Sequence, residues 1–95
     1  MLFEWDEFRR LSNLAKHGID FAGAASLFAP GGRLLTASDR RRNYSEDRFM
    51  GFGRLTSRVV AGCLTVRGQV VRIISLREAN QRETKTYSQA IENLR

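Results

Sequence analysis

The stretch Val70-Val71-Arg72-Ile73-Ile74-Ser75-Leu76-Arg77 decides the fold that we expect for this chain. Most of its apolar residues are β-branched, which is typical of a strand that is buried on at least one face. A run of the same character, residues 58–67, precedes it, and Gly68-Gln69 separates the two runs. Because glycine accepts a positive φ at the first central position of a two-residue turn, the two runs are predicted to form a β-hairpin.

The turn also predicts the register of the hairpin, because the loop length fixes which residues face each other. The expected pairs are Arg67 with Val70, Thr65 with Arg72, Cys63 with Ile74, and Ala61 with Leu76. One face then gathers the apolar side chains of a core, namely Val60, Leu64, Val66, Val71 and Ile73. Arg77 alternates onto this core face unless the strand ends before it.

The arginines of the hairpin indicate either an anion site or an ordinary sheet edge. Arg67 and Arg72 lie diagonally on one face in the predicted register. Two like charges side by side are unfavourable unless an anion lies between them. An arginine at the edge of a sheet can equally extend its guanidinium group into water. The hairpin alone leaves both interpretations open.

The length and charge of the chain favour a single domain with a polyanionic partner. Its 95 residues are enough for one modest core. Sixteen Lys and Arg residues oppose ten Asp and Glu residues, for a formal net charge of +6, and all these cations except Lys16 and Lys85 are arginines. The planar guanidinium group can bind a phosphate through two parallel hydrogen bonds, which the lysine ammonium group does not do. We therefore expect nucleic acid ahead of membrane lipid as partner, with an acidic protein as the alternative.

Cysteine usage and hydropathy favour a soluble, cytoplasmic protein that does not bind membranes. Cys63 is the only cysteine, and its place in a strand pattern predicts a small buried hydrophobe in a reducing compartment. Acidic residues near the N-terminus argue against a secretory signal. The longest uncharged stretch, residues 21–32, is too short to span a bilayer and contains Pro30.

Helix signals flank the strand-rich middle of the chain. After a short strand at residues 2–5, Asp6 is predicted to cap a helix that ends at Gly18. Apolar residues recur at helical spacing within it, namely Phe8, Leu11, Leu14 and Ala15. Asp20 is predicted to cap a second helix, which Pro30 stops. Residues 80–83 form a capping box for a C-terminal helix with Tyr87, Ile91 and Leu94 on one face.

The middle of the chain is predicted to form strands and one basic loop. Residues 33–37 and 46–54 are expected to be strands, and residues 38–45 a loop. Gly51 and Gly53 indicate a bulge or a close backbone approach. Strands joined by short turns pair antiparallel. The expected fold class is therefore α+β: a small antiparallel sheet (a meander) with two N-terminal helices and one C-terminal helix, forming one domain over residues 1–95.

The residue inventory excludes several kinds of site and leaves one reaction class. One His and one Cys do not make a zinc site, no phosphate-binding loop opens a helix, and no nucleophile elbow is present. We expect neither a metal nor a cofactor. What remains is His17, the carboxylates and the arginines. RNA cleavage by its own 2′-hydroxyl requires a base, an acid for the leaving 5′-oxygen and cations around the phosphorus.

His17 and Glu46 are the candidate proton-transfer or orienting groups. Imidazole exchanges a proton near neutral pH, although a His before a Gly is also a common residue at a helix end. Glu46 and Arg48 straddle Asp47 on a predicted strand, so their side chains point to the same face. Such a carboxylate can orient a base or a phosphate-binding group. The alternative is a surface ion pair of little energetic value.

Several motifs along the chain coincide with those of one known family. In the N-terminal half they are Phe3-Glu4-Trp5-Asp6, then Asn13-Leu14-Ala15-Lys16-His17-Gly18-Ile19, then Phe21 with Ala24 or Ala25. In the C-terminal half they are Glu46-Asp47-Arg48 with the following Gly, and Arg72-Ile73-Ile74-Ser75-Leu76-Arg77 with Ala79, Glu83 and Tyr87. Over nearly its whole length the chain resembles BrnT-type toxins. It departs from their pattern at Arg9, at Leu76 and in the basic loop at residues 40–42.

The resemblance implies a RelE-like α+β fold and an endoribonuclease that arrests translation as the toxin of a type II toxin–antitoxin pair. It also implies RNA as substrate, a cognate ribbon-helix-helix antitoxin as partner, and operator DNA bound only through the toxin–antitoxin complex. For the site we expect His17 as acid or base, Glu46 as an orienting or basic carboxylate, and four phosphate ligands, Lys16, Arg48, Arg72 and Arg77. The alternative is a non-catalytic module that binds nucleic acid or the antitoxin with the same arginine-rich face.

Overall fold

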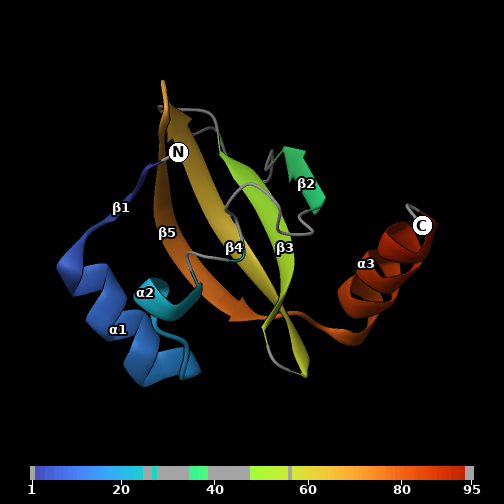
Figure 1. Cartoon of the computed structure of the whole chain (residues 1–95). Helices are drawn as coiled ribbons and strands as arrows, with labels where there is room; N and C mark the ends of the chain where they lie inside the picture. Colours follow the sequence, from blue (N-terminus) through green and yellow to red (C-terminus); the bar gives the residue numbers. More distant parts are fainter. Residues whose placement is uncertain (1, 25–26, 28–34, 39–47, 56, 94–95) are drawn as a thin grey trace.

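The residues that the structure describes form one five-stranded sheet with helices beside it (Figure 1). This computed structural model describes residues 2–24, 27, 35–38, 48–55 and 57–93. The elements are β1 (Leu2–Trp5), α1 (Glu7–His17), α2 (Phe21–Ala24), β2 (Leu35–Ser38), β3 (Phe49–Leu55), β4 (Arg58–Arg67), β5 (Val70–Glu78) and α3 (Gln81–Asn93). The α+β class is therefore confirmed. The predicted basic loop, apart from Ser38, and Glu46 lie outside the described residues.

The sheet is mixed, with the strand order β1-β5-β4-β3-β2. Strands β2 to β5 form the expected antiparallel meander. The prediction of a purely antiparallel sheet was wrong, because β1 pairs parallel with β5, with Leu2 opposite Val70 and Trp5 opposite Ile73. Short turns enforce antiparallel pairing only between strands that are neighbours in sequence. The β1 and β5 strands are separated by two helices and three strands, so that rule does not apply to them.

The central hairpin follows the predicted register only as far as a β-bulge. Gly68 has the positive φ, 60°, that the turn requires. Thr65 pairs with Arg72 as expected, but the register shifts between Leu64 and Cys63. Cys63 therefore pairs with Ser75 instead of Ile74, and Ala61 pairs with Arg77 instead of Leu76. Ile74 is the extra residue, and such a residue bends its strand and re-aims the side chains after it.

The bulge decides which side chains of β5 face the core. Leu76, opposite Gly62, lies on the same face as Ile73 and is fully buried. Arg77, which the plain alternation placed on the core face, instead lies on the opposite face with Arg72 and Ser75. The expectation for Arg77 was therefore wrong, because one inserted residue reverses the side-chain alternation beyond it.

The core lies between one face of the sheet and the segment that follows α1. Its buried side chains form one cluster: Ile19, Phe21, Ala24, Val60, Leu64, Val71, Ile73 and Leu76. Trp5 packs edge-to-face on Phe21 with ring centroids 6.4 Å apart. Leu27 approaches Gly53 so closely that a Cβ there would lie 3.1 Å from it, which fulfils the predicted close backbone approach. Val66, expected in the core, is 49% exposed near the end of the hairpin.

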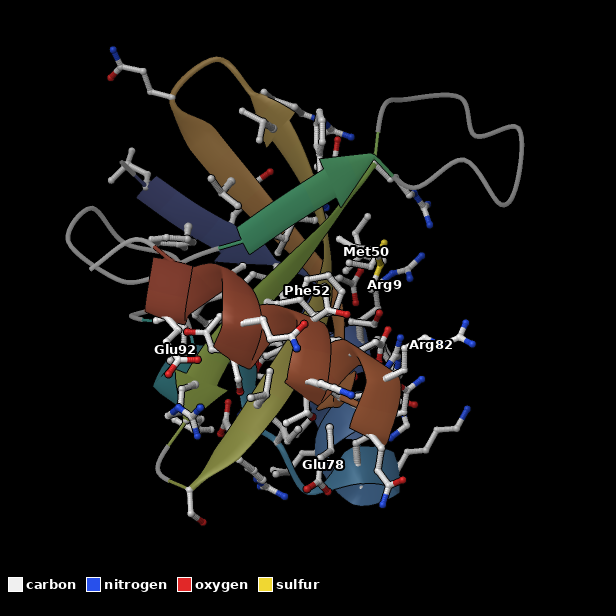
Figure 2. The ribbon with its side chains drawn as sticks, turned by 90° about the vertical axis from the view of Figure 1, so that its right-hand side faces the viewer. Arg9, Met50, Phe52, Glu78, Arg82 and Glu92 are labelled. Carbon is white, nitrogen blue, oxygen red and sulfur yellow. The ribbon has the colours of Figure 1, made fainter. Side chains whose placement is uncertain are left out.

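Helix α3 packs on the other face of the sheet, so the helices do not share one side (Figure 2). The Tyr87 side chain is buried, and the Arg54 guanidinium lies 6.0 Å from its ring centroid. The predicted capping box is confirmed: Glu83 N donates to Asn80 Oδ1 at 2.8 Å, and Asn80 N donates to Glu83 Oε1 at 3.0 Å. In the part of the chain that the structure describes, no helix combines the length and apolar character needed to cross a bilayer.

Helix α1 lies along β5 and turns its apolar side away from the sheet. Its caps are as predicted: Asp6 accepts a hydrogen bond from Arg9 N, and Gly18 adopts a left-handed conformation with φ of 70°. The only buried residue of the helix, however, is Asn13. Phe8, Leu11, Leu14 and Ala15 are exposed, with values of 87% for Phe8, 52% for Leu11 and 38% for Leu14.

Candidate active site

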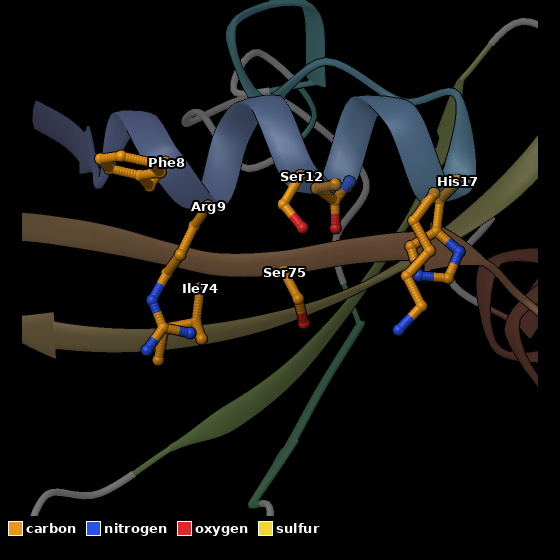
Figure 3. A pocket seen from close by; sticks show the side chains of 8 residues that line it. Phe8, Arg9, Ser12, His17, Ile74 and Ser75 are labelled. Atoms are coloured by element: carbon orange, nitrogen blue, oxygen red, sulfur yellow. The ribbon is translucent and has the colours of Figure 1, made fainter.

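A pocket of about 460 Å³ lies between α1 and the bulged part of β5 (Figure 3). Helix α1 supplies most of its lining and β5 the rest, in total Phe8, Arg9, Ser12, Asn13, Lys16, His17, Ile74 and Ser75. Phe8 and Arg9 lie at one end and His17 at the other, with Ser12 and Ser75 between them. A cavity of this size lies within the range that holds small ligands, about 300–1,000 Å³.

The α1 residues of the pocket share one side of the helix because of their spacing. Arg9, Ser12, Asn13 and Lys16 recur at three- and four-residue intervals, which places them above one another on a helix. His17 is the last residue of α1, and Gly18 ends the helix directly after it. The ring therefore stands at the helix terminus, at the end of the pocket opposite Phe8.

Asn13 holds α1 against the bulge. Its Oδ1 accepts a hydrogen bond from Leu76 N at 3.0 Å, and its Nδ2 donates to Ile19 O at 3.1 Å. The β1 strand pairs with β5 only up to Ile73, so the asparagine side chain satisfies a backbone group beyond the end of that ladder. The same side chain thus fixes the helix that carries His17 to the strand that carries Ser75.

Arg10 adds a second anchor on the other flank of α1. It forms ion pairs with Glu7 and with Asp20, the latter at 3.1 Å between Nη1 and Oδ2. The hydrogen bond with Glu7, ahead of the attraction of both carboxylates, raises the pKa of Arg10 above its ordinary value. Asp20 also accepts a hydrogen bond from Ala22 N at 3.0 Å, so this cluster connects α1 to α2.

The pocket is basic. Arg9, Lys16 and His17 line it, and the described residues of its lining include no acidic side chain. Arginine and lysine together bind phosphate oxygens, and imidazole exchanges protons near neutral pH. The arrangement is therefore suited to hold a phosphodiester and to move a proton at one of its oxygens. Within the described residues, no group of three or more His, Cys, Asp or Glu side chains is placed to hold a metal ion.

Of the six residues predicted for the site, Lys16 and His17 line the pocket. Arg72 and Arg77 do not line it, but the bulge places them on the same face of β5 as Ser75. Two strand residues separate the Cα atoms of Ser75 and Arg77 by about 7 Å. Arg72 Nη1 lies 3.3 Å from Glu4 Oε1 of β1. Arg77 donates two hydrogen bonds to the Glu83 carboxylate, at 2.7 and 2.9 Å.

The other two predicted residues are not part of this pocket as described. Arg48 is half-buried and directly precedes β3, which β4 separates from β5. Glu46 lies outside the described residues. The predicted pairing of Glu46 with Arg48 therefore stays a prediction.

Sequence reasoning missed Arg9, Ser12, Asn13 and Ser75. The polar spacing of residues 9, 12, 13 and 16 could have indicated a polar helix side, but the apolar residues of the same helix dominated the interpretation. Ser75 could not be assigned to a face, because its side depends on the bulge. Arg9 was noticed only as a departure from the family pattern.

Comparison with known proteins identifies one family. The model of a family described as "Ribonuclease toxin, BrnT, of type II toxin-antitoxin system" matches residues 5–83. The match runs from the last residue of β1 to the first turn of α3 and includes both sides of the pocket. No curated protein matches the chain.

Proposed function

The chain belongs to the BrnT family of ribonuclease toxins of type II toxin–antitoxin systems, and we propose that it cleaves RNA in the pocket between α1 and β5. The observation that carries this proposal is the presence of His17 with Arg9 and Lys16 in one cavity. An acid/base group and cations that bind phosphate are the parts that RNA cleavage by internal attack requires, and both line this pocket.

The proposed reaction needs no metal and no protein nucleophile. The ribose 2′-oxygen attacks the neighbouring phosphorus while a base removes its proton. The bond from phosphorus to the 5′-oxygen breaks, and an acid protonates that oxygen. The products are a 2′,3′-cyclic phosphate and a 5′-hydroxyl. His17 takes one of the two proton-transfer roles, and the adjacent Lys16 stabilises the added negative charge at phosphorus. Arg9 binds RNA phosphate at the other end of the pocket.

Arg72 and Arg77 are proposed to bind phosphates that flank the one being cleaved. Both lie on the same sheet face as Ser75, which supports this role. Their partners Glu4 and Glu83 hold the guanidinium groups in place, so less side-chain freedom is lost when RNA binds. Arg48 as a phosphate ligand and Glu46 as an orienting carboxylate are kept in the proposal on the sequence argument alone.

The cellular part of the proposal rests on the family. Cleavage of RNA is proposed to arrest translation, and a cognate ribbon-helix-helix antitoxin to neutralise the toxin and carry it to operator DNA. A RelE-like arrangement of the fold belongs to the same set of proposals. The part of the proposal that can be measured directly on the purified protein is the cleavage of RNA.

The test uses purified wild-type chain and a single-stranded RNA oligonucleotide in excess chelator. We expect fragments with a 2′,3′-cyclic phosphate, and no cleavage when the target nucleotide carries a 2′-deoxy sugar. His17→Ala should slow cleavage at least about 100-fold, because a positioned acid or base contributes about 10²–10⁴-fold. The control is Arg82→Ala, an exposed arginine of α3 (Figure 2) that does not line the pocket. Cleavage of the 2′-deoxy substrate at the wild-type rate would refute internal attack.

Binding without cleavage is the second candidate. The described lining of the pocket holds one imidazole and no carboxylate, which favours a site that retains phosphate without transferring two protons. In that case the wild type binds the RNA oligonucleotide with a strong salt dependence and leaves it intact. The same assay therefore separates the two functions.

A further inference from the structure

The outward side of α1 is an apolar stripe in contact with water. We define the α1 stripe as Phe8, Leu11, Leu14 and Ala15, all of which are exposed. Helical spacing gathers them on the side of α1 opposite Asn13, the residue that faces β5. Helices on the surface of a globular protein normally direct their apolar stripe toward the core. Here the buried residue is polar and the stripe points away.

Such a stripe indicates a protein partner. Single exposed apolar residues are normal on a protein surface, but a contiguous set along one helix marks an interaction site. Residues spaced at three and four positions are also the anchors through which helices dock onto one another. The family match implies that a partner exists, because a type II toxin is paired with an antitoxin.

We propose that the α1 stripe is the docking surface of the antitoxin, and that the docked segment is an amphipathic helix with acidic residues beside its apolar face. Charge argues for this occupant. Arg9 and Lys16 line the same pocket as Phe8 of the stripe, and the chain carries a net charge of +6. A second copy of the same chain would bring like charges together, whereas an acidic segment would pair with them.

Docking on the stripe also covers one end of the pocket. Phe8 belongs to the stripe and lines the pocket, and its side chain is 87% exposed at one end of it. A helix packed on Phe8 and Leu11 therefore lies over that end of the pocket, with its acidic residues facing the phosphate-binding cations. This inhibitory step rests on the proposed ribonuclease site, whereas the docking itself does not.

The test compares the same kind of substitution, an apolar residue to Glu, at two positions of similar exposure. Leu11 on the stripe is 52% exposed, and Val66 on β4 is 49% exposed. Neither residue lines the pocket. Each is changed to Glu, and the affinity of each full-length variant for its purified cognate antitoxin is measured by titration calorimetry. We expect Leu11→Glu to weaken binding at least about 30-fold and Val66→Glu to change it less than about threefold, because hot-spot residues cost about 2 kcal/mol or more.

Ala15→Glu provides a second variant, since an exposed helical alanine accepts glutamate with little loss of stability. Antitoxin affinities unchanged in both stripe variants would overturn the proposal. A second result would also overturn it: the free wild-type protein forms a dimer, and Leu11→Glu dissociates this dimer without changing the affinity for antitoxin. The stripe would then bind a second copy of the chain.

RNA cleavage is measured in parallel. Leu11→Glu should cleave RNA like the wild type but should escape inhibition by antitoxin. If the wild type cleaves no RNA, the proposed function fails while the affinities still decide the docking surface.

Discussion

The side chain of Asn13 accepts a hydrogen bond from the backbone N–H of Leu76 at 3.0 Å, across 63 positions of sequence. This bond joins the helix that carries His17 to the strand segment that the bulge has re-aimed. The same side chain donates to Ile19 O, at the start of the segment that fills the core. The pocket therefore depends on one buried amide whose oxygen and nitrogen both form hydrogen bonds with backbone groups.

We predict that Asn13→Ala lowers the free energy of unfolding by about 2–4 kcal/mol, because it leaves two buried backbone groups without partners at about 1–3 kcal/mol each. Urea denaturation followed by circular dichroism measures this change. Ser12→Ala, one position earlier and exposed, should stay within about 0.5 kcal/mol of the wild type. Equal midpoints for Asn13→Ala and Ser12→Ala would show that the Asn13 bonds do not stabilise the fold.

The two lysines of the chain provide a matched test of the pocket. Lys16 lines it, whereas Lys85 is exposed on α3. Lys16→Ala should reduce the slope of log affinity against log salt concentration by about 0.7, the value for one phosphate contact to single-stranded nucleic acid. Lys85→Ala should leave the slope unchanged. The measurement uses a 2′-O-methyl RNA oligonucleotide, which cannot undergo internal attack, and fluorescence anisotropy at four salt concentrations. An identical slope for both variants would remove Lys16 from the phosphate-binding set.

Arg77 and Glu83 permit a separation of RNA binding from folding. Their ion pair is partly exposed, so Arg77→Ala should lower the free energy of unfolding by only about 1 kcal/mol or less. If Arg77 binds phosphate, the same variant should weaken binding of the 2′-O-methyl RNA about fivefold, which corresponds to about 1 kcal/mol.

A second variant, Glu83→Gln, tests the carboxylate side of the same ion pair. Glutamine keeps an oxygen that can accept from Asn80 N and from Arg77, so the guanidinium group stays in place, but it removes the charge that competes with phosphate for Arg77. RNA affinity should therefore equal or exceed that of the wild type. A purely structural Arg77 would give unchanged RNA affinity in Arg77→Ala.

The sequence contains the signals for most elements but not for the β-bulge in β5 or for the parallel pairing of β1. The hairpin turn at Gly68, the caps of α1 and the capping box of α3 depend on local residues, and each was predicted. The bulge at Ile74 depends on which register buries Leu76 and satisfies its N–H through Asn13, and both are tertiary effects. The parallel pairing of β1 is equally non-local.

Only part of the candidate site was predictable from the sequence. His17 was identified because it carries the only imidazole of the chain, and Lys16 because it precedes His17 in a motif of the family resemblance. Arg9 and Ser75 were not, because they meet only after α1 turns its polar side to the bulged strand. The apolar spacing of Phe8 and Leu11 predicted the helix but not the side that packs on the sheet, since amphipathicity does not distinguish a core from a partner.

Gly18 and Gly68 offer the sharpest test of whether the end of α1 positions His17. Both adopt positive φ, 70° and 60°, and a Cβ at either position would meet no atom within 4 Å. Alanine at each therefore imposes the same conformational cost, about 1–2 kcal/mol, without a steric clash. Gly18 follows His17 directly, whereas Gly68 lies in the turn between β4 and β5.

Gly18→Ala and Gly68→Ala should accordingly lose similar amounts of stability in urea denaturation. Only Gly18→Ala should also lose RNA cleavage, by about tenfold or more, because a shift of the imidazole by about 1 Å is enough to cost about 10²-fold in a positioned proton transfer. Cleavage assays well below the unfolding midpoint keep both variants folded. Equal cleavage rates in the two variants would mean that the helix terminus does not set the position of the catalytic ring, and His17 would then have to act from a mobile side chain.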